Sequence, residues 1–220
     1  MRTAFQQQLA ALVDELAELC GLAARSMGGA TEALLQADLT AAEEVIGRQT
    51  ELTGRSNRAV DTAITLLALQ APVATDLRAV VSAIHVAADV ERMGGLAVHI
   101  AKVARRRHPQ RAVPDEVAGL FADMGAVAVG LAHGAQAALR DRDPQLAERV
   151  LRDDDAMDEL HHRLLTTVMT PDWRHGIAAA VDVALLGRFY ERFADHAVQI
   201  ARRVLFQTTG RHPDAGSDSG

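Results

Sequence analysis

The chain contains an internal duplication, which constrains its fold more than any other feature. Residues 89–102 read DVERMGGLAVHIAK and residues 189–202 read FYERFADHAVQIAR, and six of these 14 positions are identical at a spacing of 100. A second match, at a spacing of 105, pairs DLTAAEEVI from Asp38 with DPQLAERVL from Asp143. A repeat of this length indicates two copies of one structural unit. We therefore interpret the 220 residues as two related halves.

Both halves have the pattern of long helices. Apolar residues recur every three or four positions from Phe5 to Leu34, which predicts one apolar stripe along a helix. Aromatic residues make up only 3% of the chain, while Ala, Leu and Glu are abundant, and no segment alternates as a strand would. The expected helices cover approximately residues 4–37, 39–70, 73–107, 115–142, 144–169 and 175–207.

These helices group into an all-α fold of two tandem antiparallel three-helix bundles. The first bundle is expected over residues 4–108 and the second over residues 115–208, because the loops are short and a polar segment with two prolines, residues 109–114, lies at the midpoint. Asp38 is expected to cap the second helix, and the fifth helix is expected to begin after Asp143 with Pro144 at its first position. Residues 209–220 are polar and glycine-rich, so they are expected to form a disordered tail.

Composition restricts the compartment and the class of partner. The single cysteine, Cys20, falls in the apolar stripe of the first helix, which favours a buried thiol and a reducing compartment. We find no signal-peptide core and no stretch of about 18 apolar residues, so a soluble cytoplasmic protein without membrane insertion is expected. The net charge of −6 and the lack of a basic recognition helix argue against nucleic acid as a partner.

Two pairs of carboxylates in the second half suggest a candidate site. Asp154 and Asp158 are four residues apart on the fifth helix, and Glu191 and Asp195 are four apart on the sixth. Side chains at this spacing are neighbours on one helix face, and both pairs lie away from the apolar stripes or at their edge. Like charges this close repel unless a cation or protons compensate, and hard metals with oxygen ligands are the natural compensator.

Other interpretations of these residues stay open. Acidic pairs are common on solvated helix faces, and Arg188 and Arg192 could neutralise them through surface ion pairs. A carboxylate-bridged metal protein with a redox or storage role is the alternative function, but that chemistry needs two Glu-x-x-His motifs and the chain has one, Glu159 to His162. Among the histidines, His196 is of interest because it directly follows Asp195 in the sequence. Gly94 and Gly95 lie inside a helix, where they could permit a close helix contact.

Two segments of the chain resemble a known family. LLALQAPVATDLRAVVSAIHVAADVERMGG, in the first half, is similar to the first-repeat signature of the PhoU proteins, which regulate phosphate signalling in bacteria. GRFYERFADHAVQIARRV, residues 187–204, resembles the second-repeat counterpart, and the likeness extends over almost the whole chain. The arginine-rich composition, with Lys102 as the single lysine, resembles actinobacterial members, particularly the mycobacterial PhoY type.

The resemblance implies two three-helix bundles related by pseudo-twofold symmetry, each with an acidic motif able to bind iron or another divalent or trivalent metal at the surface. The second repeat retains the motif intact, at Asp154, Asp158, Glu191 and Asp195. The equivalent positions of the first repeat are Gln49, Thr53, Glu91 and Gly95, so Glu91 is the one remnant there. At most one metal cluster is therefore expected, in the second repeat.

The resemblance also implies a function without catalysis. PhoU proteins are negative regulators of the phosphate-starvation response, and they restrain uptake and Pho regulon expression when phosphate is plentiful. The implied partners are the phosphate ABC transporter ATP-binding subunit (PstB type) and a phosphate-sensing histidine kinase (PhoR type), and relatives can form homodimers. The expected partner-binding surface is the turn between the second and third helices, at Ala71, Pro72, Asp76 and Arg78, together with the exposed acidic face of the second repeat.

Overall fold

The computed structural model describes residues 2–70, 72 and 74–210 of the chain. Within that part the structure is helical and contains no strand, which confirms the predicted all-α class. The helices of the described residues are α1 (Arg2–Gln36), α2 (Leu39–Gln70), α3 (Ala74–Arg107), α4 (Asp115–Asp141), α5 (Pro144–Asp153), α6 (Asp155–Met169) and α7 (Gly176–Thr209). The predicted tail lies outside the described residues from position 211 onward, and α7 extends to Thr209.

Aspartate side chains cap α2, as expected of Asp38, and also α5. The Ala41 amide donates to Asp38 Oδ1 over 3.0 Å at the start of α2. At the start of α5, Asp143 Oδ1 accepts from the amides of Gln145 and Leu146, and Pro144 occupies the first turn. These bonds satisfy amide groups that have no partner within their own helix. The same device therefore begins corresponding helices in the two repeats.

The prediction of one continuous helix over residues 144–169 was wrong, because Asp154 separates α5 from α6. The interruption falls in a run of three aspartates, residues 153–155, which have low helix propensity because their side chains compete for backbone hydrogen bonds. Asp154 keeps helical dihedral angles, and its carbonyl accepts from the Met157 amide over 2.8 Å as α6 begins. The break therefore changes the hydrogen-bonding pattern without turning the chain away.

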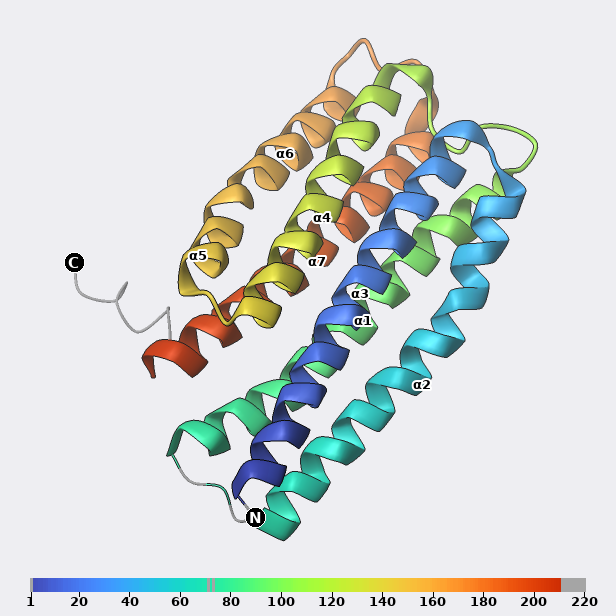
Figure 1. Ribbon diagram of the computed structural model, residues 1–220. Coiled ribbons are helices and arrows are strands. Elements are labelled where there is room, and N and C mark those ends of the chain that lie inside the picture. Colours follow the sequence, from blue (N-terminus) through green and yellow to red (C-terminus); the bar gives the residue numbers. More distant parts are fainter. Residues whose placement is uncertain (1, 71, 73, 211–220) are drawn as a thin grey trace, which may run out of the picture.

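The helices form one elongated body (Figure 1), in which α1, α3, α4 and α7 are the inner helices that contact one another. In the first half α2 packs against α1 and α3, and in the second half α5 and α6 pack against α4 and α7. Between the halves α1 packs on α4, and α3 packs on α7. Buried side chains of all these helices form a single hydrophobic core. Residues 89–102 and their duplicate at 189–202 consequently lie on two helices that contact each other.

Helix α4 is long and apolar enough, by length and composition, to cross a membrane, and it is the one described helix of which this is true. In the structure it is an inner helix that packs against α1 and α7. Val117, Phe121 and Met124 are fully buried along it. Its apolar composition is accounted for by this position in the core.

Thr31 and Tyr190 form a buried polar contact in this core. The Tyr190 hydroxyl lies 3.0 Å from Thr31 Oγ1, and Thr31 Oγ1 donates to the Met27 carbonyl over 2.9 Å. Tyr190 is fully buried, and its ring centroid lies 5.7 Å from that of Phe121. Burial raises the pKa of the Tyr190 phenol. The contact joins α7 of the second repeat to α1 of the first.

Adjacent glycines in α3 differ in their surroundings. A Cβ on Gly94 would lie 2.5 Å from Gln49 Oε1 and 2.9 Å from Leu52 Cδ1, whereas a Cβ on Gly95 would meet nothing within 4 Å. The close helix contact considered for both glycines therefore exists at Gly94 alone of the two.

We predict that Gly94→Ala lowers the free energy of unfolding by about 1–2 kcal/mol, because the side chains of Gln49 and Leu52 on α2 must shift away from the added methyl group. Gly95→Ala is the matched control and should raise it by up to about 1 kcal/mol, the gain in helix propensity. Urea denaturation followed by circular dichroism measures both. Equal effects of the two substitutions would contradict the described packing of α2 on α3.

Candidate functional site

The four carboxylates predicted as metal ligands lie where α5, α6 and α7 meet, and we call them the acidic cluster. Asp154 is at the junction of α5 and α6, Asp158 is in the first turn of α6, and Glu191 and Asp195 are one turn apart on α7. Asp158 and Asp195 are exposed, while Asp154 and Glu191 are half-buried. Helices α5 and α6 both pack on α7, so the two pairs face one another at the surface.

The carboxylates of the acidic cluster are close enough to affect one another's pKa. Burial raises the pKa of Asp154 to about 6, and the nearby charges of Asp158, Asp195, Asp155 and Glu191 add to the effect. Burial also raises the pKa of Glu191, with Asp195 contributing, although Arg188 and His161 oppose the shift. Arg188 forms an ion pair with Glu191. Negative charge is therefore concentrated here beyond what Arg188 compensates.

The side chains of the acidic cluster are of a type that binds metals, but they are not arranged around a common point. Carboxylate oxygens are the ligands that hard divalent and trivalent cations take. However, no three His, Cys, Asp or Glu side chains converge to hold a metal ion anywhere in the described part of the chain. A cation bound here would require the four side chains to change rotamer, and Glu191 to exchange Arg188 for the metal.

The corresponding positions in the first repeat are neutral or isolated. Gln49 Nε2 donates to Thr53 Oγ1 over 3.2 Å on α2, beside Gly94 of α3. Glu91 is half-buried on α3, and Gly95 has no side chain to offer. An amide and a hydroxyl that bond to each other need no cation, in contrast to the carboxylates at the equivalent positions of the second repeat.

The turn predicted to bind partners is described only in part. Ala71 lies outside the described residues, and Pro72 is half-buried. Asp76 Oδ1 accepts from Gln6 Nε2 over 3.0 Å, which ties α3 to the start of α1. The Arg78 guanidinium donates to Thr75 Oγ1 over 3.1 Å. Asp76 and Arg78 thus have local structural contacts, and their binding role stays a prediction.

The structure pairs His196 with a residue that the sequence did not suggest. His196 Nδ1 lies 3.0 Å from Asp89 Oδ1, and the side chains are only 10% and 16% exposed. His196 is on α7 and Asp89 is on α3, so the bond crosses between the repeats. Adjacency to Asp195 drew attention to this histidine, but neighbours in a helix sequence point in different directions. No spacing in the sequence could have identified a partner 107 residues away.

Cys20 is fully buried in α1, as predicted. Burial raises the pKa of its thiol to about 12, with the charge of Asp89 contributing. The thiol form is therefore strongly favoured at neutral pH, and a nucleophilic or ligand role for Cys20 is unsupported.

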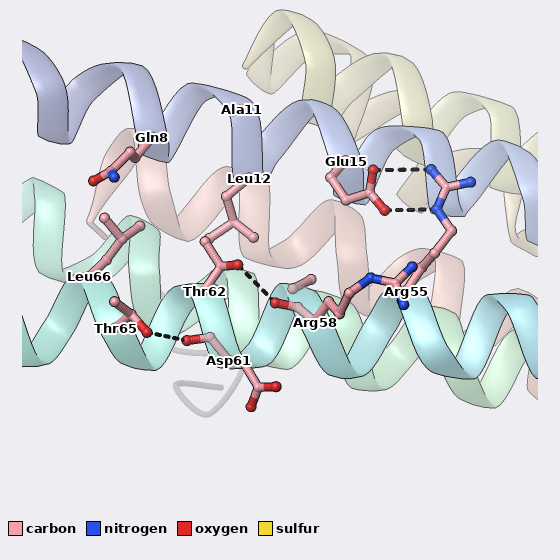
Figure 2. Close-up of a pocket in the computed structure, with 11 residues that line it drawn as sticks. Gln8, Ala11, Leu12, Glu15, Arg55, Arg58, Asp61, Thr62, Thr65 and Leu66 are labelled. Carbon is pink, nitrogen blue, oxygen red and sulfur yellow. Dashed lines mark hydrogen bonds and ion pairs between the residues drawn. The ribbon is translucent and has the colours of Figure 1, made fainter.

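A cavity of about 670 Å³ opens between α1 and α2, where apolar side chains including Leu12, Ala59 and Leu66 line it (Figure 2). At one end the Arg55 guanidinium donates to both carboxylate oxygens of Glu15, over 2.8 and 3.0 Å. This bond holds the pKa of Glu15 below its usual range. Glu15 and Arg55 thus satisfy each other, and Arg58 and Asp61 are the other described charged residues that line the cavity.

Comparisons with known proteins agree on one family. The PhoU domain family matches residues 16–104 and again residues 121–204. The chain is 58% identical over 214 residues to phosphate-specific transport system accessory protein PhoU homolog 1 of Mycobacterium leprae, covering 97% of this chain and 96% of that protein. It is 58% identical over 213 residues to PhoU homolog 2 of Mycobacterium tuberculosis, covering 97% of this chain and all of that protein.

Solved structures give the same result for the fold. The crystal structure of PhoU from Pseudomonas aeruginosa aligns with a TM-score of 0.83 at 25% identity, covering 94% of this chain and 100% of that one. The phosphate transport system regulatory protein PhoU from Streptococcus pneumoniae aligns with a TM-score of 0.84 at 24% identity, covering 96% of this chain and 99% of that one. Both alignments extend across the two repeats of the chain.

Proposed function

The chain belongs to the PhoU family, and on that premise we propose that it is a negative regulator of the phosphate-starvation response. In this proposal it couples the high-affinity phosphate ABC transporter to the sensor histidine kinase, and it restrains uptake and Pho regulon expression when phosphate is plentiful. The observation that carries the proposal is the 58% identity, over 97% of the chain, to proteins named phosphate-specific transport system accessory proteins.

The proposed activity is binding in the cytoplasm rather than catalysis, with a homodimer as one possible assembly. Exposed apolar side chains on α7 support an adaptor role. Ile177, Val181 and Leu185 recur every fourth residue and are 85%, 51% and 53% exposed, so they form a stripe on one helix face. Such a stripe fits a partner helix that packs along it.

A redox or storage protein is the weaker alternative. Glu159 and His162, the one Glu-x-x-His pair of the sequence, are both exposed on α6 rather than directed into the core. Di-iron chemistry of the ferritin type uses such motifs inside a bundle. This placement favours the adaptor function.

The test of the regulatory proposal is a reporter for a phosphate-starvation promoter. In a host lacking this gene and any second PhoU-family gene, the reporter should be active in plentiful phosphate, and the full-length chain should silence it. A reporter that stays active despite normal expression of the chain would refute the regulatory proposal.

We also propose that the acidic cluster binds a divalent or trivalent cation, with iron as one candidate. The support is the meeting of four carboxylates where α5 and α6 pack on α7. Burial, and after it the charges of the neighbouring carboxylates, raises the pKa of Asp154. Protein purified without chelator should contain metal by elemental analysis, and Glu191→Ala combined with Asp195→Ala should remove it. Asp123→Ala with Glu148→Ala, two exposed carboxylates elsewhere, is the control. Metal-free wild type from metal-supplemented cells would count against the site.

A further inference from the structure

A second cavity lies on the seam between the two repeats, and neither the acidic cluster nor the proposed adaptor role makes use of it. It has a volume of about 500 Å³ and is formed by α3 and α7, which pack side by side. Three arginines and two histidines line it: Arg92, Arg188, Arg192, His99 and His196. We call this cavity the seam groove.

The internal duplication accounts for the charge of the seam groove. Arg92 and Arg192 are equivalent positions of the Glu-Arg pair that occurs in both repeats. Since α3 packs against α7, the two copies of this arginine line one groove. Glu91 and Glu191, which precede them, are not among the residues that line it. In each Glu-Arg pair, therefore, the arginine lines the seam groove and the glutamate does not.

The positive charge of the seam groove is only partly neutralised. Arg188 is paired with Glu191, and His196 Nδ1 is bonded to Asp89. No ion pair joins Arg92 or Arg192 to any described carboxylate, and both side chains are exposed. No carboxylate is among the described residues that line the groove. In a chain of net charge −6, this is a local concentration of free guanidinium groups.

One wall of the seam groove is formed by two stacked aromatic rings. The rings of His99 and Phe189 stack with centroids 5.2 Å apart and planes 21° apart, one from each repeat. The Asp89 bond fixes the ring of His196, which is 10% exposed, and leaves its Nε2 without a hydrogen bond within the described structure. The groove therefore combines the guanidinium groups of Arg92 and Arg192, which form no ion pair with a described residue, with His196 Nε2 and an apolar wall. The contact of α3 with α7 brings these groups together.

We propose that the seam groove binds an oxyanion of the phosphate class, held by the guanidinium groups of Arg92 and Arg192. Guanidinium is planar and presents paired N–H donors that match phosphate oxygens. The volume would admit either inorganic phosphate or a phosphate ester whose organic part lies on the His99–Phe189 wall. Since one arginine comes from each repeat, a bound oxyanion would bridge α3 and α7.

The test is calorimetric titration of the full-length chain at low ionic strength with inorganic phosphate and, separately, with adenosine monophosphate. Binding of either ligand supports the proposal, and the comparison identifies the source of the phosphate group. Arg92→Gln combined with Arg192→Gln should weaken binding by about tenfold or more. Arg25→Gln combined with Arg149→Gln removes the same charge from exposed positions outside the groove and should leave affinity within about twofold.

A second variant keeps the proposal testable if the double substitution disturbs folding. Gly95 lines the seam groove and has open space where a Cβ would project, so Gly95→Asp places a carboxylate there without removing an arginine. It should weaken oxyanion binding by about tenfold or more through like-charge repulsion, and Gly95→Asn should not. Absence of binding of both ligands, or equal affinity of the groove variants and their controls, would overturn the proposal.

Discussion

Tyr190→Ala is expected to lower the free energy of unfolding by about 3–5 kcal/mol, the largest effect of any substitution considered. The ring is completely buried against Phe121, and the hydroxyl contacts Thr31 on α1. Truncation would leave a cavity between the repeats and remove the one side-chain bond of Thr31 to α7. Chemical denaturation followed by circular dichroism measures the change.

Tyr190→Phe is the matched control for this prediction. It removes only the hydroxyl, and Thr31 still donates to the Met27 carbonyl, so a loss of about 1 kcal/mol is expected. If alanine cost no more than phenylalanine, the ring would not fill the space between α1, α4 and α7 that the structure assigns to it.

Asp154→Asn is expected to stabilise the protein at neutral pH. It is also expected to make the free energy of unfolding less dependent on pH between about pH 4 and pH 6. The pKa of Asp154 is about 6 in the folded protein, against a reference value of 3.8. Between these two values Asp154 is protonated in the native state and ionised in the unfolded state. The contribution of Asp154 to the free energy of unfolding therefore falls as the pH rises through this range, and it stays low at higher pH. Because the side chain is half-exposed, we expect a gain of about 1–2 kcal/mol at neutral pH.

The difference in stability between wild type and Asp154→Asn, measured from acid to neutral pH without metal, checks this prediction. Asp123→Asn removes an exposed carboxylate far from the acidic cluster in sequence, and should change stability by less than about 0.5 kcal/mol. A difference between Asp154→Asn and wild type that does not depend on pH would mean that the acidic cluster does not interact as described.

The duplication and the periodicity predict the helices other than the division at Asp154, because both reflect local geometry. Asp38 is identified as a cap from its position alone, since a cap bonds to amides two or three residues away, and the start of α5 follows from Pro144. The break at Asp154 is not predicted, because stripe residues continue in phase on both sides of it and the low helix propensity of the three aspartates at 153–155 is its one local signal.

Properties of the site that depend on the packing of the two repeats could not be predicted. Gly94 and Gly95 are indistinguishable in sequence, yet only Gly94 contacts α2. The bond of His196 to Asp89 and the position of Arg92 and Arg192 on one groove arise from the contact of α3 with α7. The spacing placed Glu191 and Asp195 on one face and allowed an ion pair with Arg188 on the same helix, which the structure shows with Glu191.

The most direct test of the regulatory account is affinity capture of the tagged, full-length chain from cells grown with plentiful or scarce phosphate, quantified by mass spectrometry. The account predicts enrichment of the ATP-binding subunit of the phosphate transporter and of the phosphate-sensing histidine kinase, relative to an unrelated tagged protein, when phosphate is plentiful. Recovery of neither protein under either condition, with the chain expressed and folded, would contradict it.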